Sequence, residues 1–143
     1  MSVRVQGMQA KWLPQLLLLE QELQTTPMGG NFVNSLKLDN SLVIVSAGDR
    51  LQAYLLARAM GPEWELLSLA VAPDCQRQGM ARAIHQVWQQ MALDSGVEQL
   101  WLEVASNNPP AIKLYQQQGY QLQAIRKNYY PDADALLMTC SLR

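Results

Sequence analysis

The stretch "AVAPDCQRQGMARAIHQVW", residues 70–88, decides the fold, because it ends a buried strand and begins a helix within a few residues. Gly79 opens a segment whose apolar residues recur at helical spacing, at Ile84, Val87, Trp88 and Met91. A turn alone does not need a glycine and two arginines at the helix entrance. A bound anion would explain them, since a helix N-terminus offers unpaired N–H groups and the positive end of the helix dipole.

The segments around this turn predict one domain over residues 1–143. Gly48-Asp49 is a hairpin signal between two apolar runs, and Asn108-Pro109 is typical of a helix start, as cap and first-turn proline. Hairpins near the start and βαβ crossovers in the middle indicate an α/β (α+β) fold with a mixed central sheet and helices on both faces. We expect strands at residues 3–5, 42–45, 51–59, 64–71, 99–105, 120–127 and 135–142, helices at 9–24, 31–37, 79–93 and 108–119, and a loop at 25–30.

Composition narrows the function classes. The net charge of -1 and the pI near 5.7 argue against nucleic acid or an anionic membrane as a partner. Two cysteines form neither a disulfide scaffold nor a metal cluster, so we expect no metal and a cytoplasmic protein with reduced thiols. The apolar run at residues 16–19 is far too short for a membrane span, and we expect no targeting segment.

On spacing alone, the glycine turn has two equally good interpretations. It is either an anion site or an ordinary strand-to-helix turn with solvated arginines. The sequence contains neither G-x-x-x-x-G-K-S/T nor G-x-G-x-x-G, so a P-loop or a Rossmann dinucleotide site is not expected.

Gln76-x-x-Gly79-x-Ala81 after an apolar strand resembles the acetyl-CoA pyrophosphate loop (Q/R-x-x-G-x-G/A) of GCN5-related N-acetyltransferases, the GNAT superfamily. Three later segments, "LWLEV" (residues 100–104), "NPPAIKLYQQQGY" (108–120) and "RKNYYP" (126–131), are similar to its RimI-like branch, which acetylates the N-termini of ribosomal proteins. Residues 66–138 carry the resemblance. It implies a GNAT-like fold and an N-acetyltransferase that uses acetyl-CoA as co-substrate.

The resemblance also implies which residues act. Glu103 would be the general base and Tyr115 the general acid toward the departing sulfur of coenzyme A. The pyrophosphate would lie over the glycine turn, and the pantetheine beside the preceding strand and past Asn108. The cofactor-binding residues expected on this basis are Leu69, Ala70, Val71, Gln76, Arg77, Gln78, Gly79, Met80, Ala81, Arg82 and Asn108.

Each of these side chains also has a plainer interpretation. Glu103 could be a strand-end carboxylate in solvent, and Tyr115 a core residue with its hydroxyl at the rim. As the acid, Tyr115 would work best with a pKa below its usual 10, because the thiolate's pKa is near 8.5. We expect Cys75 to be structural or incidental, and His85 to lie on the helix surface or in packing.

The resemblance implies an amine acceptor, and energetics favour an α-amine. Freeing the base form of a lysine at pH 7 costs roughly 3 kcal/mol more than freeing that of an α-amino group. We therefore expect direct attack of a protein N-terminal amine, in the RimI-like case that of a ribosomal protein, without a covalent enzyme intermediate. The alternatives are a small-molecule amine acetyltransferase and a non-catalytic acyl-CoA-binding module that regulates a partner.

The acceptor-binding loops differ from the family pattern. The loop at residues 26–29 lacks the aromatic segment of the family, and the loop after Pro131 is short. Tyr129 and Tyr130 precede that proline, and we expect them to point apart in a loop, so that one of them lines a peptide groove. The alternative is a hairpin capped by stacked rings.

Overall fold

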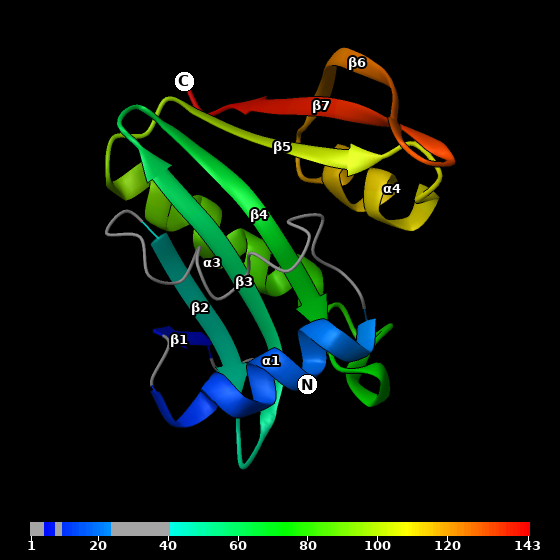
Figure 1. The fold of residues 1–143 in the computed structure, drawn as a ribbon. Helices are drawn as coiled ribbons and strands as arrows, with labels where there is room; N and C mark the ends of the chain where they lie inside the picture. The colour runs from blue at the N-terminus through cyan, green and yellow to red at the C-terminus, as the bar shows by residue number, and fades with distance from the viewer. Residues whose placement is uncertain (1–4, 8–9, 24–40) are drawn as a thin grey trace.

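The computed structural model describes residues 5–7, 10–23 and 41–143 (Figure 1). In chain order its elements are β1 (Val5–Gly7), the 3-10 turn η1 (Ala10–Trp12), α1 (Leu13–Leu23), β2 (Ser41–Ala47), β3 (Leu51–Met60), β4 (Glu63–Val71), the 3-10 turn η2 (Pro73–Cys75), α3 (Met80–Asp94), β5 (Gln99–Ala105), α4 (Pro109–Gln117), β6 (Gln121–Tyr130) and β7 (Ala133–Ser141).

One seven-stranded sheet organises these elements, in the order β1-β2-β3-β4-β5-β7-β6. The β4–β5 pair is parallel and the other neighbours are antiparallel, so the sheet is mixed as expected. The parallel pair is short: Glu63–Glu65 pairs with Gln99–Trp101, and the two strands diverge beyond it (Figure 1). This divergence separates the two halves of the sheet at its centre.

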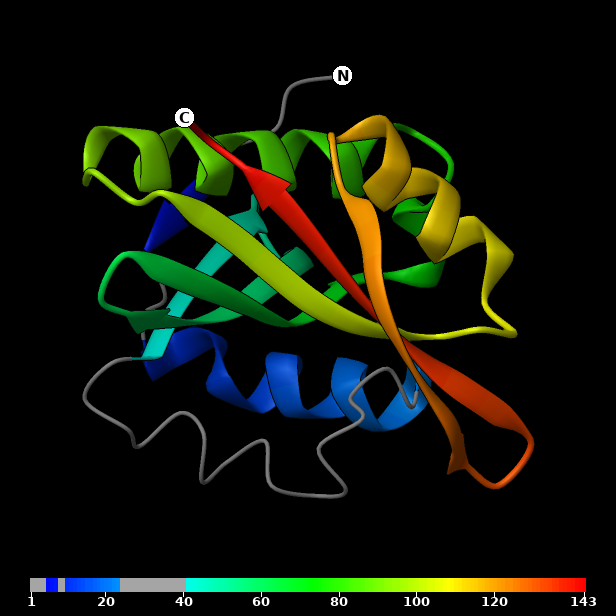
Figure 2. The ribbon, with the colours of Figure 1, turned by 90° about the horizontal axis from the view of Figure 1, so that it is seen from above.

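Helices cover both faces of the sheet, which confirms the predicted layers. Figure 2 shows α3 and α4 on one face and α1 on the other. The core between them contains fully buried side chains such as Leu16 of α1, Leu55 and Leu56 of β3, and Trp88 of α3. In β5, Leu100, Leu102 and Val104 are buried and alternate with half-buried neighbours, as a strand between two layers requires.

The face of α3 that is buried differs from the predicted one. Ile84 and Trp88 are buried, but Val87 is 37% exposed and His85 is completely buried in its place. The buried face of the helix is therefore rotated by part of a turn from the predicted one. The 3.6-residue period predicts that the helix has an apolar face, but not which of its residues contact the sheet.

The final hairpin is also longer than predicted. Strand β6 continues to Tyr130, because a register shift between Arg126 and Tyr130, with Asn128 at φ +57°, lets pairing resume at Ala133. Tyr129 and Tyr130 thus end a strand instead of lying in a loop. The predicted helix at residues 31–37 and loop at 25–30, with its segment 26–29, lie outside the described residues.

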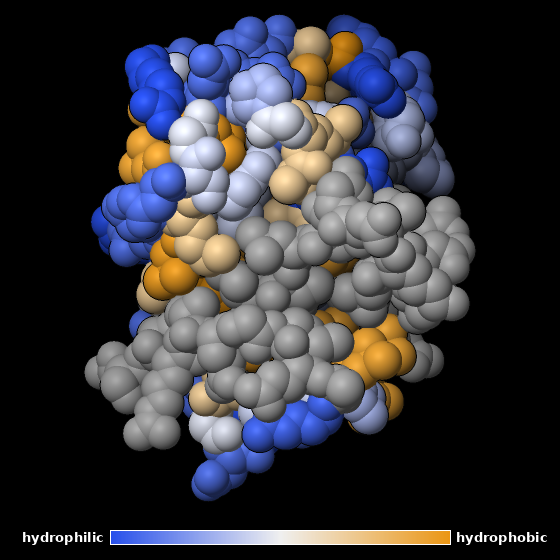
Figure 3. All heavy atoms as spheres, turned by 90° about the vertical axis from the view of Figure 1, so that its left-hand side faces the viewer, coloured by the Kyte–Doolittle hydropathy of each residue, from blue (hydrophilic) through white to orange (hydrophobic). Residues whose placement is uncertain are grey.

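The side of the molecule at the left of Figure 1 carries hydrophilic residues at its top and bottom, with apolar residues between them (Figure 3). Scattered apolar residues are normal on a protein surface. Within the described part of the chain, we find no helix with the length and apolar character that a membrane span needs.

Candidate active site

The turn between β4 and α3 leaves backbone donors free at a helix start. Gly79 is the N-cap at φ +78°, a left-handed conformation that favours glycine, and no side chain caps the helix. Ala83 is the first residue whose amide donates to a helical acceptor, the Gly79 carbonyl, at 3.0 Å. The amides of Met80, Ala81 and Arg82 therefore remain for an external acceptor, which is the arrangement that binds anions.

The loop before Gly79 is held by its own side chains. Gln76 Nε2 donates to the Val71 carbonyl at 3.0 Å, which ties the loop back to the end of β4. Arg77 has φ +63°, a left-handed conformation that is uncommon outside glycine. Gln76 thus shapes the loop with its side chain, while the exposed Arg77 keeps its guanidinium free for a ligand.

A cavity of about 540 Å³ opens beside this turn, between β4, α3 and α4. It brings together every residue that we expected to bind the cofactor except Gln78. Asn108 reaches it from the start of α4, where its Oδ1 accepts a hydrogen bond from the Ala111 amide at 3.4 Å. The lining residues are Leu69, Ala70, Val71, Cys75, Gln76, Arg77, Gly79, Met80, Ala81, Arg82, Asn108, Pro110, Leu114 and Gln117.

Sequence reasoning missed four of these residues. Pro110, Leu114 and Gln117 lie three and four residues apart, so they share one face of α4, and this spacing was the signal that could have found them. Cys75 is buried at 5% exposure and forms part of the wall.

Glu103 lies in a second cavity, of about 290 Å³, on the β5 side of the strand divergence. Its carboxylate Oε1 is 3.7 Å from Nη1 of Arg126 on β6. The cavity is lined by Glu65, Leu66, Leu67, Glu103, Arg126, Tyr129 and Tyr130. The structure therefore brings the predicted base and both predicted substrate tyrosines to one place.

The two tyrosines do not point apart as expected. Their rings meet edge to face, with centroids 5.0 Å apart, and the guanidinium of Arg126 lies 5.4 Å from the Tyr129 ring centre. The register shift near the end of β6 turns both rings toward the same cavity. Tyr129 is 53% exposed, so a ligand can reach its face.

The pKa values of two further groups, Glu65 and Tyr130, show that the Glu103 cavity is acidic and partly shielded from solvent. Burial raises the pKa of Glu65; Arg58 opposes this shift, and the like charge of Glu103 adds to it. Burial also raises the pKa of Tyr130, with smaller contributions from Glu103 and Tyr129. Two carboxyl groups, those of Glu65 and Glu103, therefore line the same cavity.

Tyr115 projects from α4 into an aromatic cluster. Its ring packs edge to face on Tyr120 at 5.7 Å and lies 6.4 Å from His85. Burial raises the pKa of Tyr115 to about 12, so the expected lowering of this pKa is wrong: an apolar site disfavours the phenolate. Tyr115 lines neither cavity, although Leu114 and Gln117 beside it line the first.

Both cavities border β4. Glu65 is the last residue of β4 that pairs with β5. Of the residues that follow it, Leu66 and Leu67 line the Glu103 cavity, and Leu69 to Val71 line the cavity beside the glycine turn. Beyond Glu65, the edge of β4 that faces β5 no longer pairs with it. An elongated ligand can therefore lie along this strand from one cavity to the other.

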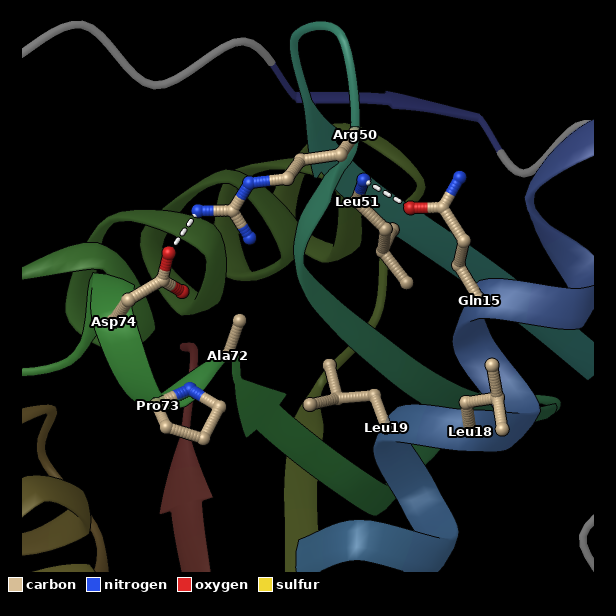
Figure 4. Close-up of a pocket in the computed structure, with 8 residues that line it drawn as sticks. All are labelled: Gln15, Leu18, Leu19, Arg50, Leu51, Ala72, Pro73 and Asp74. Atoms are coloured by element: carbon tan, nitrogen blue, oxygen red, sulfur yellow. Dashed lines mark hydrogen bonds and ion pairs between the residues drawn. The ribbon is translucent and has the colours of Figure 1, made fainter.

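A third cavity, of about 410 Å³, lies on the α1 face (Figure 4). Gln15 of α1 accepts a hydrogen bond from the Leu51 amide at 2.8 Å, and Arg50 forms an ion pair with Asp74 of η2. Arg50 also lies 3.6 Å from the Sγ of Cys75, so the β2–β3 turn braces the loop that precedes Gly79. Among the described residues, no His, Cys, Asp and Glu side chains cluster as metal ligands.

The comparisons with known proteins agree with this geometry. The sequence profile of the acetyltransferase (GNAT) family matches residues 11–120. A ribosomal protein bS18-alanine N-acetyltransferase of Salmonella typhimurium is 38% identical over 98 residues, which make up 66% of this chain and 66% of that protein, a little under two-thirds of its length.

Solved structures agree as well. The ribosomal-protein-S18-alanine N-acetyltransferase from Escherichia coli superposes with a TM-score of 0.87 at 27% identity, over 99% of this chain and 94% of that one. A GNAT family acetyltransferase from Elizabethkingia anophelis with acetyl-CoA bound has the same fold, with a TM-score of 0.82 at 17% identity over 98% of both chains. These matches confirm the resemblance seen in the sequence, and the chain belongs to the acetyltransferase (GNAT) family.

Proposed function

We propose that this protein transfers the acetyl group of acetyl-CoA to the α-amine of a protein N-terminus. A ribosomal protein is the acceptor that the names of its relatives suggest. The observation that carries the proposal is the pair of cavities on either side of the point where β4 and β5 diverge, one with free helix amides and the other with Glu103.

The first cavity suits coenzyme A. The amides of Met80 to Arg82 and the guanidiniums of Arg77 and Arg82 would hold the pyrophosphate, and Gly79 leaves room because no Cβ covers the backbone. The pantetheine would hydrogen-bond to the edge of β4 at Leu69 to Val71, which does not pair with β5. The thioester would then lie near the end of the paired segment, between the two cavities.

The second cavity suits the acceptor amine. Glu103 would take a proton from the ammonium or from the attacking amine, and the amine nitrogen would form a bond to the thioester carbonyl carbon while the C–S bond breaks. Tyr115 would return a proton to the departing thiolate. Its raised pKa keeps the phenol protonated, ready to donate.

The rim of this cavity supports a peptide acceptor. Tyr129 and Tyr130 offer two rings and two hydroxyl groups beside Glu103, and aromatic rings of this kind contact peptides at low entropy cost. We place the reaction in the cytoplasm, in keeping with two buried cysteines that are not bonded to each other.

A peptide array treated with labelled acetyl-CoA tests the proposal. We expect label on peptides with a free N-terminal alanine and none on the same peptides with a blocked α-amine and free lysines. A kcat/KM higher for small amines than for every peptide would instead identify a small-molecule enzyme. Coenzyme A binding without transfer to any amine would leave only the binding module.

A further inference from the structure

Two polar side chains one turn apart on α3 point into the interior. His85 is completely buried, and its Nε2 is 2.9 Å from the hydroxyl of Tyr120. Gln89 Nε2 donates to the Gln118 carbonyl at 3.3 Å. Both contacts reach the same short corner between α4 and β6, at residues 118–120. Side chains of α3 thus hold the end of α4 through this corner.

The corner is bonded in turn to the backbone of Tyr115. The Tyr120 amide donates to the Tyr115 carbonyl at 3.0 Å, and the Gln118 amide donates to the same carbonyl at 3.0 Å. The Tyr115 ring rests on the rings of Tyr120 and His85. Its position therefore depends on the His85–Tyr120 contact at both the backbone and the ring.

This geometry matters because α3 and α4 form opposite walls of the cofactor cavity. The N-terminus of α3 supplies Gly79 to Arg82, and α4 supplies Leu114, next to Tyr115. The backbones of the two helices make few close contacts, so α3 and α4 meet through side chains, among them the rings of His85 and Tyr115. The side chains that cross from α3 to the corner are further contacts between the two walls.

Hydrophobic packing alone would not need this polar pair. Burial lowers the pKa of His85 to about 4, with the Gln118 side chain opposing the shift, so the ring is neutral at pH 7. A buried neutral pair stabilises little more than apolar side chains of the same shape, because its hydrogen bond mainly offsets the cost of desolvation. The pair instead fixes how the two rings are oriented, because a hydrogen bond depends on angle and distance. Apolar contacts would let the rings shift relative to each other.

We propose that His85, Gln89 and Tyr120 form a clamp that positions Tyr115 relative to the cofactor turn. The three are positioning residues and do not touch the reacting atoms. The proposal rests on the proposed function, in which Tyr115 protonates the departing sulfur.

The test is a set of full-length variants with matched shapes. His85→Leu and Tyr120→Phe each leave one buried polar group unpaired, whereas the double variant removes both. His85→Gln keeps a donor and acceptor at a similar reach and is the conservative control. Turnover is followed as coenzyme A release from saturating acetyl-CoA with a peptide that has a free N-terminal alanine, alongside the melting temperature and the Kd for coenzyme A.

We expect each single variant to melt lower than the wild type and the double variant to melt above both. The double variant should nevertheless lose about tenfold in kcat, with the Kd for coenzyme A within about twofold, because displacement of a catalytic group slows chemistry more than it weakens binding. His85→Gln should restore most of the kcat.

A Tyr115→Phe background separates positioning from general damage. If the clamp acts through Tyr115, adding His85→Leu and Tyr120→Phe there should cause no further loss in kcat. The same tenfold loss in that background, or wild-type kcat in the double variant, overturns the clamp alone. Wild-type kcat in Tyr115→Phe itself removes the proposed acid, and the clamp with it.

Discussion

Replacing Gly79 with valine should weaken coenzyme A binding far more than it destabilises the fold. A Cβ at this position would meet no protein atom within 4 Å, so the change causes no internal clash. The cost to stability comes from the backbone, since φ +78° disfavours a residue with a side chain by about 1–2 kcal/mol. That corresponds to a drop in melting temperature of roughly 3–8 °C for a domain of this size.

The effect on binding has another origin. The open space beside Gly79 is the space that we assign to the pyrophosphate, and valine would fill it. Each hydrogen bond to a charged group contributes about 1.5–3 kcal/mol. Losing one of those from Met80 to Arg82 should raise the Kd by about 10- to 150-fold, and losing two by up to about 20,000-fold.

Gly61 provides the matched control. It lies in the β3–β4 turn at φ +65°, and a Cβ there also meets nothing within 4 Å, but it does not line the cofactor cavity. Gly61→Val should therefore lower the melting temperature by a similar amount and leave the Kd unchanged. Calorimetric titration with coenzyme A compares the two. Equal affinities in folded Gly79→Val and Gly61→Val would refute the pyrophosphate site.

Three further predictions concern the acceptor cavity. Glu103→Gln should lower kcat by about 100- to 10,000-fold at pH 7 and leave the Kd for coenzyme A unchanged. The loss in kcat should be smaller at high pH, where more of the amine is unprotonated, and full activity at pH 7 would show that Glu103 is structural. Tyr129→Ala and Tyr130→Ala should each raise the peptide KM several-fold without affecting coenzyme A binding. Normal kinetics with a lower melting temperature would show that the two rings only pack against the protein. Glu65→Gln should raise the melting temperature at pH 7 by at most a few degrees, because a carboxylate whose folded pKa is raised destabilises the fold when ionised. Its gain should vanish below pH 4.5, where Glu65 is protonated in both states; a gain that persists at low pH would contradict the electrostatic cause.

Much of the cofactor site could be predicted from the sequence, because its signals are local. A glycine at a helix start and an asparagine cap before Pro109 are signals that act within a few residues, and the structure has both as expected. In β5, the two-residue period of a strand puts Glu103 on the face opposite the buried Leu102 and Val104. The face of α4 that completes the cavity could not be predicted in this way, because it is defined by its contact with elements from another part of the chain.

The sequence by itself determined the order of elements, the glycine turn and the side of β5 on which Glu103 lies, since each depends on backbone preference or on a period of two or 3.6 residues. Tertiary structure alone decided that β5 diverges from β4, that His85 replaces Val87 inside, and that burial raises the pKa of Tyr115 instead of lowering it. These outcomes depend on contacts between strands and helices that are distant in sequence. Such contacts decide which face of each element is buried and how far each titratable group is shielded from solvent.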